Sequence, residues 1–257
     1  MIHSVIPPGA SGPPVLFVHG AWHAAWCWQG WMSRLGAAGI PSHAIDLPRH
    51  GRPGDRRRRW TGLGSYASAV VEAIDLLGPR VVVGHSMGGL VCQRALERRT
   101  VDLGVLLASV PPSGVASATL RTLRRAPRAV VGANVMLSMW PIVATSALAR
   151  QAFFTPETDE AVVWSTWARL ENESYPAYLE MMLVRARPGR VSTPMRVMAA
   201  DGDGIFTLDE QRTLAAAYGV EVAVIERSGH DIMLDSPADQ AADMLVDWVR
   251  EAGSGGQ

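Results

Sequence analysis

The chain has 257 residues, of which 48% are hydrophobic, and its 24 basic residues balance 24 acidic ones. This composition suits one large α/β domain with an insertion, and the lack of net charge gives no overall attraction to nucleic acid or to an anionic membrane. Every basic residue other than histidine is arginine, so a P-loop lysine, a Schiff-base lysine and a Ser-Lys dyad are excluded.

The cysteines, two of the histidines and the apolar runs narrow the kinds of site and the class of protein further. Cys27 and Cys92 have no CxxC partner, so we expect two buried thiols rather than a disulfide or a zinc site. His19 and His23 stand at i, i+4 without the glutamate of a zinc protease, and we predict no metal and no cofactor. No signal-peptide pattern and no run of about 18 apolar residues is present, which predicts a cytoplasmic protein without a membrane span.

Short apolar runs alternate with helical patterns along most of the chain. The runs are rich in Val, Ile and Leu, as in strands buried on both faces, and they occupy 15–18, 40–46, 81–83, 103–109, 195–200 and 220–226. Helices are predicted between most of them, at 66–77, 90–98, 208–218 and 237–250. The alternation predicts an α/β fold with a mostly parallel sheet flanked by helices.

One interval, from about 113 to 190, contains only amphipathic helical patterns and no strand pattern. We therefore predict a core formed by 1–112 and 191–257 and a helical cap insertion over 113–190. Active sites of open α/β sheets lie at the carboxyl ends of the strands, so the cap is expected to cover the site. Its Trp and Met residues predict an apolar pocket, to which we assign Trp140.

Residues 81–89 read VVVGHSMGG, and Ser86 lies in a G-x-S-x-G motif between a predicted strand and a predicted helix. This is the context of a nucleophile elbow, in which a serine takes a sparsely populated backbone conformation. Gly84 and Gly88 leave the room that such a turn needs. The turn also places the hydroxyl at a helix N-terminus, where free N–H groups can stabilise an oxyanion. We predict that Ser86 is a nucleophile.

A serine nucleophile needs a base and an acid that orients it. Of the seven histidines, only His230 follows Ser86 in the chain, so an order of serine, acid and histidine leaves it as the single candidate base. Asp201 and Asp203 both follow the predicted strand 195–200. The spacing alone does not choose between these two carboxylates.

The sequence resembles the α/β-hydrolase superfamily, and within it the branch of plant methyl-ester esterases and hydroxynitrile lyases. The motifs that carry the resemblance are VLFVHGAW, DLPRHGRP, VVVGHSMGG, DGDGIF and RSGHDIML. The resemblance implies that Asp203 is the acid and that the backbone amides of Ala21 and Met87 form an oxyanion hole. Trp22, beside that loop, is expected to face the substrate. The run 56–59 of four arginines is expected to be a solvated loop.

Two departures from related enzymes disfavour other reactions. The hydroxynitrile-lyase branch has a lysine after the catalytic histidine, where this chain has Asp231, so cyanohydrin cleavage is disfavoured. The serine nucleophile disfavours the dehalogenase and epoxide-hydrolase reactions, which use aspartate.

Three functions fit these features. The first is a serine esterase acting on small apolar substrates through an acyl-enzyme. The second is a thioesterase or acyltransferase, whose partner would be a carrier protein or CoA. Four arginines at helical spacing could hold a phosphate-bearing arm of such a partner, namely Arg121, Arg124, Arg125 and Arg128. The third is a ligand-binding receptor that retains the triad with little turnover.

Overall fold

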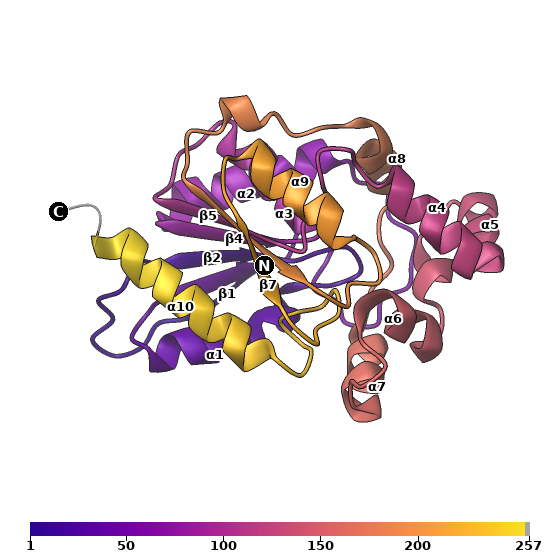
Figure 1. Cartoon of the computed structure of the whole chain (residues 1–257), viewed down its shortest axis with the longest axis horizontal. Helices are drawn as coiled ribbons and strands as arrows, with labels where there is room; N and C mark the ends of the chain where they lie inside the picture. Colours follow the sequence, from indigo (N-terminus) through magenta and orange to yellow (C-terminus); the bar gives the residue numbers. More distant parts are fainter. Residues whose placement is uncertain (255–257) are drawn as a thin grey trace.

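A seven-stranded sheet forms the centre of the computed structural model, which describes residues 1–254 (Figure 1). The last three residues of the predicted core segment 191–257 lie outside this described part. The strand order is β1-β3-β2-β4-β5-β6-β7, and only β1 runs antiparallel to its neighbour. The strands are β1 (Ile2–Val5), β2 (Val15–Val18), β3 (Ser42–Ile45), β4 (Val81–His85), β5 (Leu103–Leu107), β6 (Met195–Ala200) and β7 (Val222–Ile225).

The predicted α/β class is confirmed, and a strand forms at each of the six predicted places. The edge strand β1 was not predicted. Its four residues are mostly exposed and pair only with β3, so they lack the apolar run by which the buried strands were recognised.

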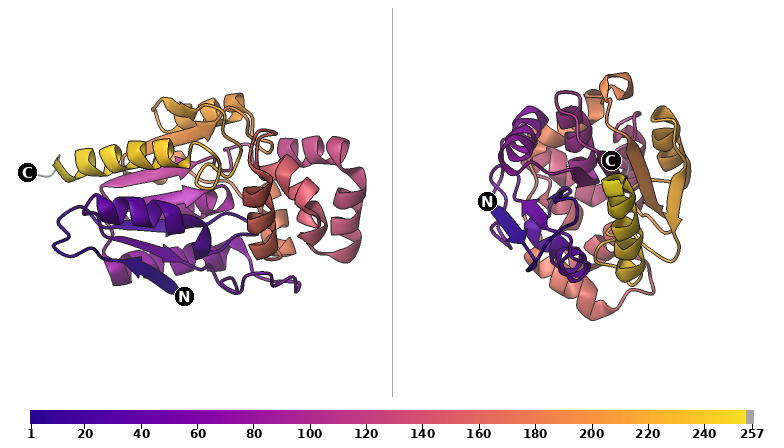
Figure 2. Two further views of the ribbon diagram at one scale, coloured as in Figure 1. Left: turned by 90° about the horizontal axis from the view of Figure 1, so that it is seen from below. Right: turned by 90° about the vertical axis from the view of Figure 1, so that its left-hand side faces the viewer.

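Helices cover both faces of the sheet, as the two views of Figure 2 show. Successive residues of a strand point to opposite faces. Leu16 and Val18 of β2 therefore join one core cluster, whereas Val15 and Phe17 join the other. The first cluster packs against α2 (Leu63–Leu77), α3 (Met87–Leu96) and α9 (Leu208–Ala217), and the second against α1 (Gln29–Ala37) and α10 (Ala238–Ser254). Both predicted thiols are buried.

The segment between β5 and β6 is entirely described and contains helices but no strand. Its α-helices are α4 (Ala116–Arg125), α5 (Pro127–Met136), α6 (Ser146–Phe153), α7 (Glu160–Arg169) and α8 (Tyr175–Leu183). Figure 2 shows these helices gathered at one end of the sheet, beyond the ends of the strands. We call this segment the cap, and its division from the core at 113 and 190 stays a prediction. No helix of the described part is long and apolar enough to cross a bilayer.

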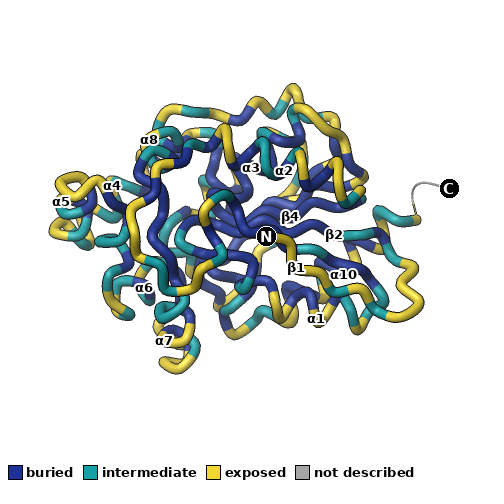
Figure 3. Tube along the Cα trace, turned by 180° about the vertical axis from the view of Figure 1, so that it is seen from behind, coloured by how far each residue is buried: buried dark blue, intermediate teal, exposed yellow. Residues whose placement is uncertain are grey.

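Between α7 and α8 the cap contains a buried strap, which we define as residues 170–174. All five of its residues are buried although four of them are polar (Figure 3). Glu171 accepts hydrogen bonds from the backbone N–H groups of Gly51 and Arg52 and forms an ion pair with Arg59. Arg59 also donates to the Asn172 carbonyl at 2.7 Å. Arg59 is thus buried, and the expectation of a solvated loop is wrong for this arginine.

We expect Arg59→Met to lower the free energy of unfolding by about 3 kcal/mol, because it leaves the carboxylate of Glu171 buried without its cation. Arg58→Met is the matched control, since the neighbouring Arg58 is exposed, and its effect is expected to stay within about 0.5 kcal/mol. Urea unfolding of both variants measures the difference. Equal stabilities would show that the ion pair does not hold the strap.

Candidate active site

Ser86 lies between the end of β4 and the start of α3, with a backbone φ of 52° and ψ of −119°. This positive φ is sparsely populated by residues other than glycine. The Ser86 N–H donates to the Leu107 carbonyl at 3.0 Å, and the Ser86 carbonyl accepts from Gly89 N at 3.0 Å. The strand-to-helix turn that the motif predicted is therefore present at this serine.

The glycines beside Ser86 permit the close approach of neighbouring segments. A Cβ atom on Gly88 would lie 2.3 Å from the His19 carbonyl oxygen, and one on Gly84 would lie 2.7 Å from the Sγ of Cys92. A Cβ on Gly20 would lie 2.7 Å from Nδ1 of His85. The loop after β2 is thereby packed directly against the turn that contains the serine.

His230 and Asp203 meet at the carboxyl edge of the sheet. Nδ1 of His230 lies 2.8 Å from the Oδ2 of Asp203, and both side chains are buried. The other oxygen of Asp203 accepts from the backbone N–H groups of Ile205 and Phe206 at 2.7 and 2.9 Å. These bonds fix the carboxylate, which in turn fixes the orientation of the imidazole.

Asp201, the alternative acid, is placed differently. It is exposed, and its carboxylate accepts from Ser228 N at 3.3 Å instead of contacting His230. Within residues 1–254, no hydrogen bond joins the Ser86 hydroxyl to His230. Catalytic hydrogen bonds are often longer without substrate and shorten in the substrate complex, so this geometry leaves a proton-transfer role open to His230.

Two predicted oxyanion donors face the same cavity as Ser86. Ala21, Ser86 and Met87 all contribute to its lining. The backbone N–H groups of Ala21 and Met87 donate to no other atom of residues 1–254, so both are available to a ligand. Met87 is the first residue of α3, where the helix dipole adds a partial positive charge.

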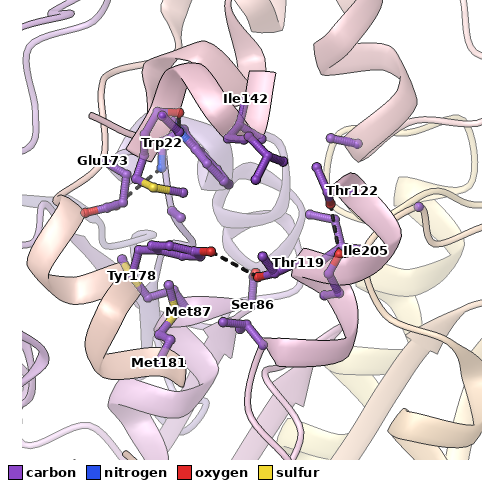
Figure 4. A pocket seen from close by; sticks show the side chains of 18 of the residues that line it. Trp22, Ser86, Met87, Thr119, Thr122, Ile142, Glu173, Tyr178, Met181 and Ile205 are labelled. Atoms are coloured by element: carbon purple, nitrogen blue, oxygen red, sulfur yellow. Dashed lines mark hydrogen bonds between the residues drawn. The ribbon is translucent and has the colours of Figure 1, made fainter. Parts of the chain in front are cut away.

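The cavity has a volume of about 110 Å³ and a mainly apolar lining. Figure 4 shows Trp22 and Ile142 on one side of it and Tyr178 and Met181 on another, with Ser86 among them. Thr119 accepts a hydrogen bond from the Tyr178 hydroxyl at 3.3 Å. The apolar character comes from Trp22, Met87, Val110, Val130, Ile142, Met181 and Phe206.

The two predicted pocket tryptophans differ in position. Trp22 lines the cavity, and its indole N–H donates to the Met139 carbonyl at 3.2 Å. Trp140 is absent from the lining and instead lies under the guanidinium of Arg56, whose carbon is 4.5 Å from the ring centre. Its position therefore gives no support to the predicted pocket role of Trp140.

Two neutral histidines support the site. Burial and the neighbouring His230 and His23 lower the pKa of His85 well below its ordinary value. Nε2–H of His85 can then donate to the His230 carbonyl oxygen, 3.1 Å away. Burial and His50 likewise lower the pKa of His19, which donates from Nδ1 to the Gly20 carbonyl and accepts from Leu47 N. Both rings hold the backbone of loops that carry the predicted site residues.

Asp231 does not line the cavity. It is fully buried and lies 2.9 Å from Nε2 of His23. Burial alone would lower the pKa of His23, but the attraction of Asp231 and the hydrogen bonds to Asp231 and the Ala21 carbonyl together raise it above its ordinary value. The residue at the position of the lyase-branch lysine thus belongs to a buried ion pair.

The buried strap reaches the predicted oxyanion loop, which contains Ala21 and Trp22, from the cap, and the sequence analysis did not identify the strap. Trp22 has a positive φ of 64°. Its carbonyl accepts from Glu171 N at 2.8 Å, and its N–H donates to the carboxylate of Glu173 at 3.4 Å. Glu173 also accepts from His50 at 3.1 Å and from Tyr66 at 2.9 Å, contacts that lower its pKa against the opposing effect of burial. The only sequence signal was the pair of acids in LENES, which no helical pattern explains.

Residues 15–244 match the model of the alpha/beta hydrolase family. The chain belongs to the alpha/beta hydrolase family.

Among the residues that the structure describes, no group of three or more His, Cys, Asp or Glu side chains is arranged to hold a metal ion.

Curated relatives match over part of this hydrolase. It is 36% identical over 107 residues to the probable esterase PIR7A of Oryza sativa subsp. indica, covering 40% of this chain and 41% of the relative. It is 31% identical over 102 residues to methyl jasmonate esterase 1 of Vitis vinifera, covering 38% and 39% of the two chains. The match thus spans about two fifths of the length of these relatives.

Solved structures are similar over nearly the whole chain. An esterase from Thermogutta terrifontis superposes with a TM-score of 0.74 at 18% identity, covering 98% of this chain and 93% of that one. The putative non-heme bromoperoxidase BpoC of Mycobacterium tuberculosis gives a TM-score of 0.76 at 17% identity, covering 98% and 96%. At such identities the likeness shows the fold alone.

Proposed function

We propose that this hydrolase cleaves carboxylic esters of small apolar substrates through an acyl-enzyme intermediate. The observation that carries the proposal is the 2.8 Å contact between His230 and Asp203 at the sheet edge where Ser86 occupies its strained turn. The similarity to proteins named as esterases supports the same reaction class.

In this proposal each residue of the site has one role. Ser86 Oγ attacks the ester carbonyl carbon while His230 accepts the hydroxyl proton, and the amides of Ala21 and Met87 bind the oxyanion that forms. Asp203 holds His230 with Nδ1 protonated, so that Nε2 is free to act as the base. His230 then protonates the departing alcohol, and a water molecule, deprotonated by His230, hydrolyses the acyl-enzyme to the acid.

The cavity supports a small, uncharged acyl group. Its 110 Å³ is somewhat less than the apolar cavity of about 150 Å³ that holds benzene in an engineered protein. Glu173 is the buried carboxylate in the lining, and its bonds to His50, Tyr66 and Trp22 leave it little capacity for a ligand. We propose that the cap forms the roof of this pocket.

A thioesterase that acts on carrier-bound acyl chains is the second candidate. Arg125 favours it, because this exposed arginine lines the cavity and carries a charge that suits a phosphate-bearing arm. Arg121 does not contribute, since its guanidinium forms an ion pair with Glu210 and donates to the Ile205 carbonyl. The relative kcat/KM for matched thioesters and oxyesters distinguishes the two functions.

A fluorophosphonate probe is expected to modify Ser86, and Ser86→Ala should abolish both the labelling and ester hydrolysis. The probe reports a serine that the site activates, and steady-state turnover of simple esters distinguishes an enzyme from a binding protein with a retained triad. Intact-mass analysis and peptide mapping locate the label. Label at another residue, or an active alanine variant, would contradict the assignment.

Asp203→Asn is expected to lower kcat by up to about 10⁴-fold, because the amide favours the wrong imidazole tautomer. Asp201→Asn, the matched control, should change kcat by less than about threefold, since its side chain is exposed and does not contact His230. Steady-state kinetics on one activated ester compares the two variants. The reverse order of losses would identify Asp201 as the acid.

The value of kcat/KM should rise roughly fourfold per methylene of the acyl chain until the cavity is full, because each buried CH₂ contributes about 0.8 kcal/mol. Met181→Ala enlarges the lining and should move the optimum to a longer chain, whereas Trp140→Ala, outside the lining, should not. The measurement uses p-nitrophenyl esters from acetate to laurate. A flat profile, or an equal shift in both variants, would show that the cavity does not select the acyl group.

A further inference from the structure

The outer surface of the α4–α5 hairpin is apolar and exposed. We call residues 116–137 the cap tip. Leu120 and Leu123 of α4 are 46% and 38% exposed, and Val131 and Val135 of α5 are 56% and 79% exposed. Figures 1 and 3 show the cap tip at the end of the molecule opposite the C-terminal helix. A soluble protein rarely leaves adjacent large apolar side chains in contact with water without a binding role.

The charge of the cap tip differs from that of the chain as a whole. No Asp or Glu occurs between Asp102 and Glu157, although the chain has equal numbers of acidic and basic residues. Arg124 and Arg128 are exposed and form no ion pair with any residue of the described part. The tip therefore combines an apolar surface with free positive charge.

The exposed apolar side chains and the positive charge lie on one face of α4. Leu120, Leu123 and Arg124 stand at i, i+3 and i+4 and are all exposed. The opposite face of the hairpin lines the cavity through Ala118 and Val130. The cap tip is thus a thin wall between the cavity and the exterior.

We propose that the cap tip docks on an anionic lipid surface, with its apolar side chains at the headgroup boundary and its arginines on lipid phosphates. This is how basic amphipathic helices bind an interface. A second copy of the chain is a poorer occupant, because its arginines would face those of the first. A protein partner would need a groove shaped to the protruding hairpin, whereas a lipid surface adapts to it.

Binding to lipid does not depend on the proposed ester hydrolysis. The catalytically silent Ser86→Ala chain can therefore be used for the binding measurement, and failure of one proposal is distinguishable from failure of the other. Docking on lipid would let an apolar ester pass from the lipid into the cavity, and this role of the cap tip rests on the proposed function.

The experiment is co-sedimentation of full-length Ser86→Ala protein with vesicles of phosphatidylcholine and phosphatidylglycerol in equal parts, or of phosphatidylcholine alone. The protein should bind the mixed vesicles, and added salt should weaken the binding. Arg124→Gln with Arg128→Gln should weaken it about 25-fold, from about fivefold per arginine. Adding Leu123→Ser and Val135→Ser to this variant should weaken vesicle binding further. Circular dichroism checks that each variant is folded.

The matched control is Leu76→Ser with Arg98→Gln, which removes an exposed apolar side chain and an exposed arginine outside the cap tip. It should bind the mixed vesicles as tightly as the parent. Absence of binding to mixed vesicles, or equal losses in the control and tip variants, would overturn the proposal. So would a tip-dependent dimer, or binding to an acidic acyl carrier protein in place of vesicles.

Discussion

The strained turn at Ser86 determines how the rest of the site is assembled. With φ at 52°, the serine requires small neighbours, and the glycines around it bring other segments into contact. A Cβ on Gly88 would collide with the end of β2 at Val18 and His19, and one on Gly89 would lie 2.2 Å from the hydroxyl of Ser109 after β5. The carboxyl ends of three neighbouring strands therefore converge on one point, where the hydroxyl meets a helix N-terminus.

The predicted oxyanion loop needs support from outside the core, and the buried strap provides it. Trp22 has an unfavourable positive φ, so its peptide groups must be held by neighbours. The backbone N–H of Glu171 donates to the Trp22 carbonyl, and the carboxylate of Glu173 accepts from the Trp22 N–H. The carboxylates of both glutamates are buried. Burying two charges is costly unless each is paired and hydrogen-bonded, which Arg59, His50 and backbone N–H groups achieve. The loop that contains Ala21 and Trp22 and the cap are thus joined by polar contacts in the interior.

Local patterns in the sequence were enough to predict six of the seven strands and the elbow, because buried strands and a G-x-S-x-G turn depend on neighbouring residues. The choice between Asp201 and Asp203 needed the family resemblance, since both follow β6 and only the course of the loop decides which faces His230. The strap could not be predicted, because Arg59 and Glu171 are 112 residues apart and each looks like a surface charge on its own. The pocket role of Trp140 stays a prediction that its position does not support, since composition does not reveal which side of a cap helix a ring occupies.

Three buried acidic side chains near the site each contact a histidine. Asp203 is bound to His230, Asp231 to His23, and Glu173 to His50 and Tyr66. Asp203 and Glu173 accept several hydrogen bonds and have little capacity left for a substrate, whereas Asp231 lies outside the cavity lining. Within the described part of the chain, the cation that lines the cavity is Arg125, which is exposed and donates to the Gly204 carbonyl. Of the charged side chains in this lining, Arg125 therefore has more capacity than Glu173 to bind a charged group of a ligand.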